Sequence, residues 1–208
     1  NWKMNGLTSS LGEVRRLGEL LSQGAAPRCT VAICPPATLL ARVSEMAATS
    51  GIVTGGQDCH IAQSGAHTGD LSATMLADAG AQFVIVGHSE RRAGYGEIDD
   101  TVRTKAQAGF SAGLVPIICV GETEAERSNG DAEAIVAHQL ATAIPAEAEG
   151  IETIVAYEPV WAIGTGLTPT IDDIARMHGM IRTHLVERFG AGGGNIRILY
   201  GGSLKPAN

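Results

Sequence analysis

The chain has 208 residues and a net charge of -7, because 22 acidic residues outnumber 15 basic ones. This length suits one domain with a sizeable core, and 44% hydrophobic with 18% charged residues is typical of a globular rather than a disordered protein. No apolar run reaches the roughly 18 residues of a membrane span, and the clustered basic face that nucleic acid requires is missing. We therefore expect neither a membrane protein nor a nucleic-acid-binding protein.

The chain has four cysteines, at positions Cys29, Cys34, Cys59 and Cys119. Their spacing is neither that of zinc ligands nor that of a thioredoxin motif. Three of them lie in or next to apolar runs, which favours buried, reduced thiols and a cytoplasmic protein.

Short β-branched runs alternate with longer helical patterns along the chain. The expected strands are nearly continuous in apolar residues, as in a parallel sheet buried on both faces. They are Thr30–Cys34, Ile52–Gly55, Phe83–Gly87, Pro116–Val120, Thr153–Tyr157 and Ile196–Tyr200. Apolar stripes at helical spacing include Leu11–Leu21, Leu39–Ala47 and Ile171–Leu185. No low-complexity linker interrupts the pattern, so we expect a single domain over residues 1–208.

Repeated βα units allow two architectures, an open doubly wound sheet or a closed (β/α)8 barrel. A dinucleotide-binding sheet needs the pattern G-x-G-x-x-G directly after its first strand. The nearest match begins at Gly164, follows a late strand, and has Pro169 in place of the third glycine. The pattern therefore argues against a dinucleotide fold.

Three polar side chains follow apolar strands at the ends where a barrel places its site. Glu158 stands between a strand and Pro159, where a partly desolvated carboxylate has the pKa that a general base needs. His88 follows Phe83–Gly87 and is either a catalytic imidazole or a helix cap. Glu122 follows a third strand, where a salt-bridge partner is the commoner role.

Three further signals each have a plain structural alternative. Lys3 alone among the three lysines occupies a strand-end position, although an ordinary surface lysine is the alternative. The stretch Pro159–Gly166 places an apolar tip between a proline and a Gly-Thr-Gly tail, as a lid over a site requires, and a fixed loop is the alternative. Gly201, Gly202 and Ser203 offer backbone N–H groups to an anion, or form a simple turn.

The histidines other than His88 show no metal-ligand spacing. His178 and His184 are six residues apart, so they face different sides of a helix, and His60 and His67 flank a glycine-containing loop without matched carboxylate spacing. We expect structural or solvated histidines and no metal site.

Four motifs, in order and at the right separations, resemble the triosephosphate isomerase family over the whole chain. They are N-W-K-M-N-G at 1–6, V-G-H-S-E-R-R at 86–92, A-Y-E-P-V-W-A-I-G-T-G at 156–166 and Y-G-G-S at 200–203. The resemblance implies a (β/α)8 TIM barrel and the interconversion of dihydroxyacetone phosphate and D-glyceraldehyde 3-phosphate through an enediolate, without a cofactor.

The resemblance also implies a role for each matching residue. Glu158 is the base, His88 the neutral electrophile, and Lys3 and Asn1 bind the substrate and stabilise developing charge. Gly164 and Ser203 supply N–H groups to the phosphate under the lid. The supporting residues are Ser89, Glu90, which is expected close to Lys3, and Tyr200, which is expected to latch the lid with Ser203.

The segment His60–Ser72 resembles the loop through which the family forms homodimers. Thr68 is expected to approach the partner subunit's site, and Asp70 stands where the family usually has glutamate. We therefore expect a weakened contact from Asp70 to Arg91 of the partner.

A complete barrel has about 250 residues, and most of the first strand and the eighth βα unit of the family are missing here. We therefore expect a barrel truncated at both ends and a longer gene product. A Schiff-base aldolase needs a lysine within a strand, and a metal-dependent epimerase needs inward histidine and aspartate ligands. Neither pattern is present. A non-catalytic relative would lack Glu158, His88 or Lys3, and all three are present.

Overall fold

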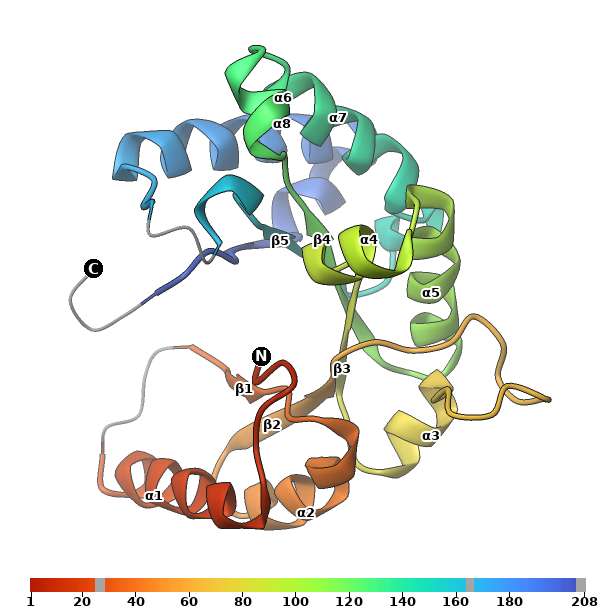
Figure 1. Ribbon diagram of the computed structural model, residues 1–208, viewed down its shortest axis with the longest axis vertical. Helices are drawn as coiled ribbons and strands as arrows, with labels where there is room; N and C mark the ends of the chain where they lie inside the picture. Colours follow the sequence, from red (N-terminus) through yellow and green to blue (C-terminus); the bar gives the residue numbers. More distant parts are fainter. Residues whose placement is uncertain (25–28, 164–166, 205–208) are drawn as a thin grey trace. The chain divides into compact units, whose positions relative to one another are not determined.

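The computed structural model describes residues 1–24, 29–163 and 167–204. The chain divides into two compact units, Asn1–Ile85 with Ala108–Pro116, and Val86–Gln107 with Ile117–Asn208. In Figure 1 the first unit runs mostly from red to yellow and the second mostly from green to blue. Within the described ranges, every helix is too short or too polar to cross a bilayer.

The first unit alternates helices with parallel strands. Its elements are η1 Thr8–Ser10, α1 Leu11–Ser22, β1 Val31–Ile33, α2 Ala37–Ala47, β2 Ile52–Gly56, α3 Ala73–Asp78 and β3 Phe83–Val86. Strand β1 pairs with β2, and β2 pairs with β3, in parallel register. The apolar stripes of α1 and α2 pack over these strands, where Val14, Leu39 and Val43 meet Ile33 and Ile52. Their helical spacing in the sequence therefore builds the core of this unit.

The second unit repeats the pattern with longer helices. Its elements are α4 Ser89–Tyr95, α5 Asp99–Ser111, β4 Val115–Val120, α6 Glu124–Ser128, α7 Ala132–Ala143, η2 Ala146–Glu149, β5 Ile154–Tyr157, η3 Val160–Ala162, α8 Ile171–Asn195 and β6 Arg197–Tyr200. The end of α5 and the first two residues of β4 belong to the first unit. Strands β4, β5 and β6 pair in parallel and in chain order. Helices α7 and α8 pack together (Figure 1) and bury Leu140 and Ile181.

All six expected strands are confirmed to within about one residue at each end. Some details of burial were wrong, including the exposure of Ala32 in β1 and of Leu20 in α1. Ile171 is 84% exposed, and the buried stripe of α8 begins only at Met177. Strand β6 is not buried on both faces, because Arg197 and Leu199 are exposed while Ile198 and Tyr200 are partly covered. That alternation is typical of a strand with one open face.

Candidate active site

The carboxylate of Glu158, directly after β5, lies against the start of helix α4. The Ser89 N–H donates to Oε2 at 2.9 Å, and His88 Nε2 lies 2.9 Å from Oε1. The Glu158 and His88 side chains are only 4% and 10% exposed. The first N–H groups of a helix have no partner within it and favour an anion. The buried carboxylate therefore has a donor on each oxygen.

The hydrogen bonds of His88 fix the tautomer of its ring. As the N-cap of α4, His88 accepts the Glu90 N–H at Nδ1, at 3.2 Å. A ring nitrogen that accepts a hydrogen bond carries no proton, so the proton of the neutral imidazole is on Nε2 and faces Glu158. The helix cap, one of the two roles considered for His88, is confirmed. The catalytic role of the ring stays a prediction. The half-exposed Glu90 carboxylate lies 3.8 Å from Nδ1.

The backbone at Glu158 depends on two glycines. The Glu158 N–H donates to the Val120 carbonyl at 2.8 Å. A Cβ on Gly121 would lie 1.8 Å from the Glu158 carbonyl oxygen, and one on Gly201 would lie 2.9 Å from Glu158 Cγ. The neighbouring strand ends therefore approach the base more closely than any side chain at these positions permits.

Gly121→Ala is expected to lower the free energy of unfolding by about 1–3 kcal/mol, because the added methyl group must displace the backbone of Glu158. Gly179→Ala is the matched control, since no atom lies within 4 Å of its Cβ position in α8. There the substitution is expected to stabilise by up to about 1 kcal/mol. Denaturant midpoints measured by circular dichroism compare the two variants. Equal stability of both variants would contradict the close approach at Gly121.

Glu122 is fully buried at the end of β4 and anchors the stretch that follows Glu158. Its carboxylate accepts the Tyr157 hydroxyl at 3.0 Å and the Trp161 indole N–H at 2.8 Å, with Arg127 at 3.5 Å. Burial, reinforced by the Glu122 charge, raises the pKa of Tyr157 above its usual range. The salt-bridge role expected for Glu122 is confirmed, and the carboxylate also holds Trp161.

Arg127 contacts residues on both sides of segment 164–166. Its guanidinium stacks on the Trp161 ring at 4.3 Å and donates to Asp173 in the first turn of α8 at 2.8 Å. The Thr170 hydroxyl and N–H, together with Arg127, lower the pKa of Asp173 to about 2. The predicted phosphate donor Gly164 lies outside the described residues.

Lys3 and Asn1, in the first unit, are held together by backbone and side-chain bonds. The Lys3 N–H donates to Asn1 Oδ1 at 2.8 Å. Lys3 has a φ of 54°, a left-handed conformation that is uncommon for a residue with a side chain. The Gln57 amide donates to the Lys3 carbonyl at 3.0 Å and to the Cys34 carbonyl at 2.9 Å. Gln57 was missed, although its position after β2 follows the same strand-end rule that identified Glu158.

Arg91, the predicted dimer contact, has a partner within its own chain. Its Nε donates to Glu97 at 2.6 Å, and Lys105 donates to the same oxygen at 2.6 Å. Burial alone would raise the pKa of Glu97, but these two cations lower it. The guanidinium also stacks on Tyr95 at 4.3 Å. The contact of Arg91 with a partner subunit stays a prediction.

The remaining predicted residues lie in the second half of the chain or in loop 60–72. Tyr200 ends β6 opposite Tyr157 of β5, and burial raises its pKa. Ser203 is exposed three residues later, and Thr68 and Asp70 are exposed in the loop. Their predicted contacts with a lid or a partner stay predictions.

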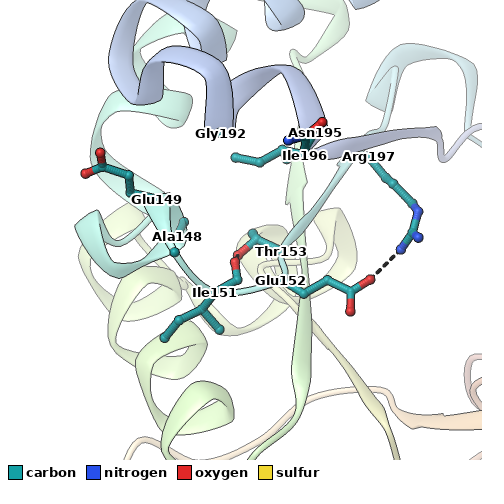
Figure 2. A pocket seen from close by; sticks show the side chains of 10 residues that line it. Ala148, Glu149, Ile151, Glu152, Thr153, Gly192, Asn195, Ile196 and Arg197 are labelled. Atoms are coloured by element: carbon teal, nitrogen blue, oxygen red, sulfur yellow. Dashed lines mark hydrogen bonds and ion pairs between the residues drawn. The ribbon is translucent and has the colours of Figure 1, made fainter.

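A cavity of about 290 Å³ lies at the opposite end of β5 and β6 from Glu158. Figure 2 shows the start of both strands at its wall, with Thr153 and Ile196, and the ion pair of Glu152 with Arg197. None of the predicted site residues lines this cavity. The cluster around Glu158, rather than this cavity, is therefore the candidate active site in the second unit.

Comparison with known proteins agrees with the geometry. A sequence profile described as triosephosphate isomerase matches residues 1–208. Proteins named triosephosphate isomerase from Afipia carboxidovorans and Chelativorans sp. are 56% and 50% identical, and the whole chain aligns with 82% of the length of each.

A solved structure also has this fold. The crystal structure of triosephosphate isomerase from Bartonella henselae superposes with a TM-score of 0.89 at 45% identity, over 100% of this chain and 83% of that one. The α/β fold class of a TIM barrel, expected from the sequence, is confirmed. With the profile matching from end to end, the chain belongs to the triosephosphate isomerase family.

Proposed function

We propose that the protein interconverts dihydroxyacetone phosphate and D-glyceraldehyde 3-phosphate by proton transfer, with Glu158 as the base and no cofactor. Membership of the family supports the activity. The observation that carries the mechanism is the buried pair of Glu158 and His88, with Nε2 and Oε1 2.9 Å apart. A carboxylate and a neutral imidazole donor are the two groups that enolisation next to a carbonyl requires.

Glu158 is held in a resting position by its two donors. Hydrogen bonds from the Ser89 N–H and the His88 ring occupy both carboxylate oxygens. To accept a proton from carbon, the side chain leaves these donors for the substrate. The freed carboxylate oxygen is then available to accept the proton from carbon.

His88 becomes available in the same movement. When Glu158 leaves, the Nε2 proton can turn to a substrate carbonyl oxygen, because Nδ1 remains bonded to the Glu90 N–H. A neutral donor stabilises the developing enediolate. It can then move a proton from one enediolate oxygen to the other. Lys3 and Asn1 add positive charge and hydrogen bonds at the same oxygens. The net charge of -7 repels a phosphate dianion, so such local donors are needed.

The stretch Pro159–Gly166 is the proposed lid. Trp161, near the start of this stretch, donates its indole N–H to Glu122 and stacks on Arg127, so the first part of the proposed lid is anchored. Gly164 and Ser203 are the proposed phosphate donors, and Tyr200 and Ser203 the proposed latch. Closure excludes water and holds the enediolate, which otherwise loses phosphate.

We propose one barrel domain over residues 1–208 and a homodimer formed through loop 60–72, with Thr68, Asp70 and Arg91 at the contact. We propose a cytoplasmic location, which is supported by the buried free thiols of Cys34, Cys59 and Cys119.

Conversion of D-glyceraldehyde 3-phosphate by the purified protein in deuterated water tests the reaction. Transfer through Glu158 exposes the proton to solvent exchange, so NMR is expected to show dihydroxyacetone phosphate carrying deuterium at carbon 1. Product that retains its protium throughout would contradict exchange of the transferred proton with solvent at Glu158. A folded protein that forms no product at all would overturn the proposed activity.

A further inference from the structure

One side chain of helix α7 binds both backbone groups of Gly121, the residue directly after β4. Gln139 Oε1 accepts the Gly121 N–H at 2.7 Å, and the Gln139 amide donates to the Gly121 carbonyl at 3.1 Å. A primary amide carries the same donor and acceptor as a peptide group. The side chain therefore continues the hydrogen bonding of the sheet beyond Val120, where β4 ends, from a position 18 residues further along the chain.

Gly121 also lies against the backbone of the proposed base. Val120 and Glu122, on either side of it, accept the N–H groups of Glu158 at 2.8 Å and of Val160 at 3.1 Å. At Gly121 itself, the Glu158 carbonyl oxygen lies 1.8 Å from the position that a Cβ would take. No side chain separates the two backbone segments, so a shift of Gly121 is passed on to Glu158.

The Glu158 carboxylate has a narrow range of useful positions. One oxygen lies 2.9 Å from the Ser89 nitrogen and the other 2.9 Å from His88 Nε2. To accept a proton from carbon, the carboxylate must then come within hydrogen-bond reach of the substrate. A misplacement of about 1 Å can cost about 10²-fold in rate. A group that fixes the backbone beside the base therefore contributes to catalysis without touching the substrate.

We propose that Gln139 is a positioning residue for Glu158 and acts through the backbone of Gly121. The inference rests on the proposed isomerase function and adds a residue that lies outside the four sequence motifs. Helix α7 gives Gln139 a rigid base, because Val136 and Leu140 on the same helix are buried. A side chain held in this way fixes a site more precisely than one on a loop.

Gln139→Met in the purified full chain tests the proposal, because methionine has a similar volume and lacks both hydrogen-bonding groups. We expect kcat to fall about 10-fold or more and KM to change less than about 2-fold, since the proposed phosphate donors are untouched. The primary isotope effect with D-glyceraldehyde 3-phosphate deuterated at carbon 2 is expected to rise. Proton transfer to Glu158 then becomes slower relative to substrate binding and product release.

Gln139→Glu supplies a rescue. The ionised carboxylate can accept the Gly121 N–H but cannot donate to the Gly121 carbonyl, whereas the protonated carboxyl can do both. The kcat of this variant, relative to that of the wild-type protein, is therefore expected to rise as the pH falls through the pKa of the introduced carboxyl. A ratio that does not rise over this range would contradict the role of the amide donor.

Val136→Ala is the matched control for stability. This side chain is fully buried one turn earlier in α7, so its truncation is expected to lower the thermal unfolding midpoint without touching Gly121. Well below that midpoint, kcat is expected to stay unchanged. An equal loss of kcat in Val136→Ala and Gln139→Met would mean that general loosening of α7, rather than the bond to Gly121, lowers turnover.

The Ser89 amide provides a readout that does not depend on activity. Its proton is hydrogen-bonded to the Glu158 carboxylate, so its NMR chemical shift reports where that carboxylate lies. A changed Ser89 shift and a lower kcat in Gln139→Met would support the proposal. An unchanged shift and kcat, with faster hydrogen exchange at Gly121, would overturn it and leave Gln139 a purely structural residue. If the wild-type protein had no isomerase activity, the proposed function would fail, and the Ser89 shift would still decide whether Gln139 positions Glu158.

Discussion

Glu158→Gln is expected to lower turnover by at least about 10³-fold while largely preserving the affinity for substrate. The amide has nearly the same shape as the carboxylate but cannot accept a proton from carbon. The proposed phosphate donors, Gly164 and Ser203, are untouched. The loss should therefore appear in kcat rather than in KM.

Two companion variants sharpen this test. Glu158→Asp keeps the charge but shortens the side chain by one methylene, so an intermediate loss of about 10²-fold is expected from misplacement alone. Glu187→Gln removes an exposed carboxylate on α8 and should leave turnover unchanged. Steady-state kinetics in both directions measures all three. More than a tenth of the original turnover in Glu158→Gln would remove Glu158 from its role as base.

His88→Asn is expected to lower turnover by about 10²–10³-fold, because the donor that faces Glu158 is lost. Asparagine is among the best N-cap residues and can accept the Glu90 N–H in place of Nδ1. The helix start is then preserved, and the loss of activity reports the missing donor.

His88→Ala supplies the contrast, because it removes both the cap and the donor. It is expected to lose about 1 kcal/mol of stability beyond His88→Asn, together with a similar loss of turnover. Thermal unfolding and steady-state kinetics separate the two effects. If His88→Asn were fully active, the ring would serve only as a helix cap.

The strands and the positions of His88 and Glu158 were predictable because they follow from short-range patterns. The run of apolar residues Ile154–Tyr157 is buried, and the polar residue that follows such a strand is a candidate for the site. The sequence also contained the glycines that crowd Glu158. That Gly121 must be glycine became clear only from the 1.8 Å approach of the Glu158 carbonyl to its Cβ position.

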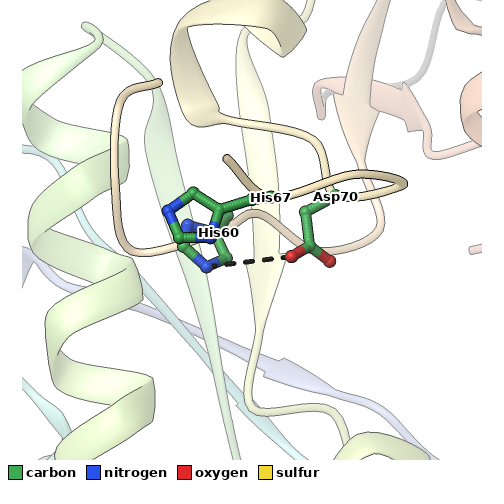
Figure 3. Close-up of side chains that lie close together, drawn as sticks. All are labelled: His60, His67 and Asp70. Atoms are coloured by element: carbon green, nitrogen blue, oxygen red, sulfur yellow. Dashed lines mark ion pairs between the residues drawn. The ribbon is translucent and has the colours of Figure 1, made fainter. Parts of the chain in front are cut away.

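What could not be predicted depends on how distant segments fold against each other. Gln57 holds the Lys3 carbonyl from 54 positions away, and no local pattern encodes that bond. His67 and Asp70 are brought to His60 by a turn and a glycine with positive φ (Figure 3), while regular helix or strand spacing would separate them. The tautomer of His88 likewise depends on a backbone N–H whose direction only the helix start sets.

The two tryptophans of the chain give it a built-in spectroscopic reporter in each compact unit. Trp2 packs against the core of the first unit, and Trp161 stacks under Arg127 in the second. Single-tryptophan proteins made by Trp2→Phe or Trp161→Phe would let fluorescence follow each unit separately during denaturation. Coincident transitions are what one cooperative domain requires, and separated transitions would mean that the units unfold independently.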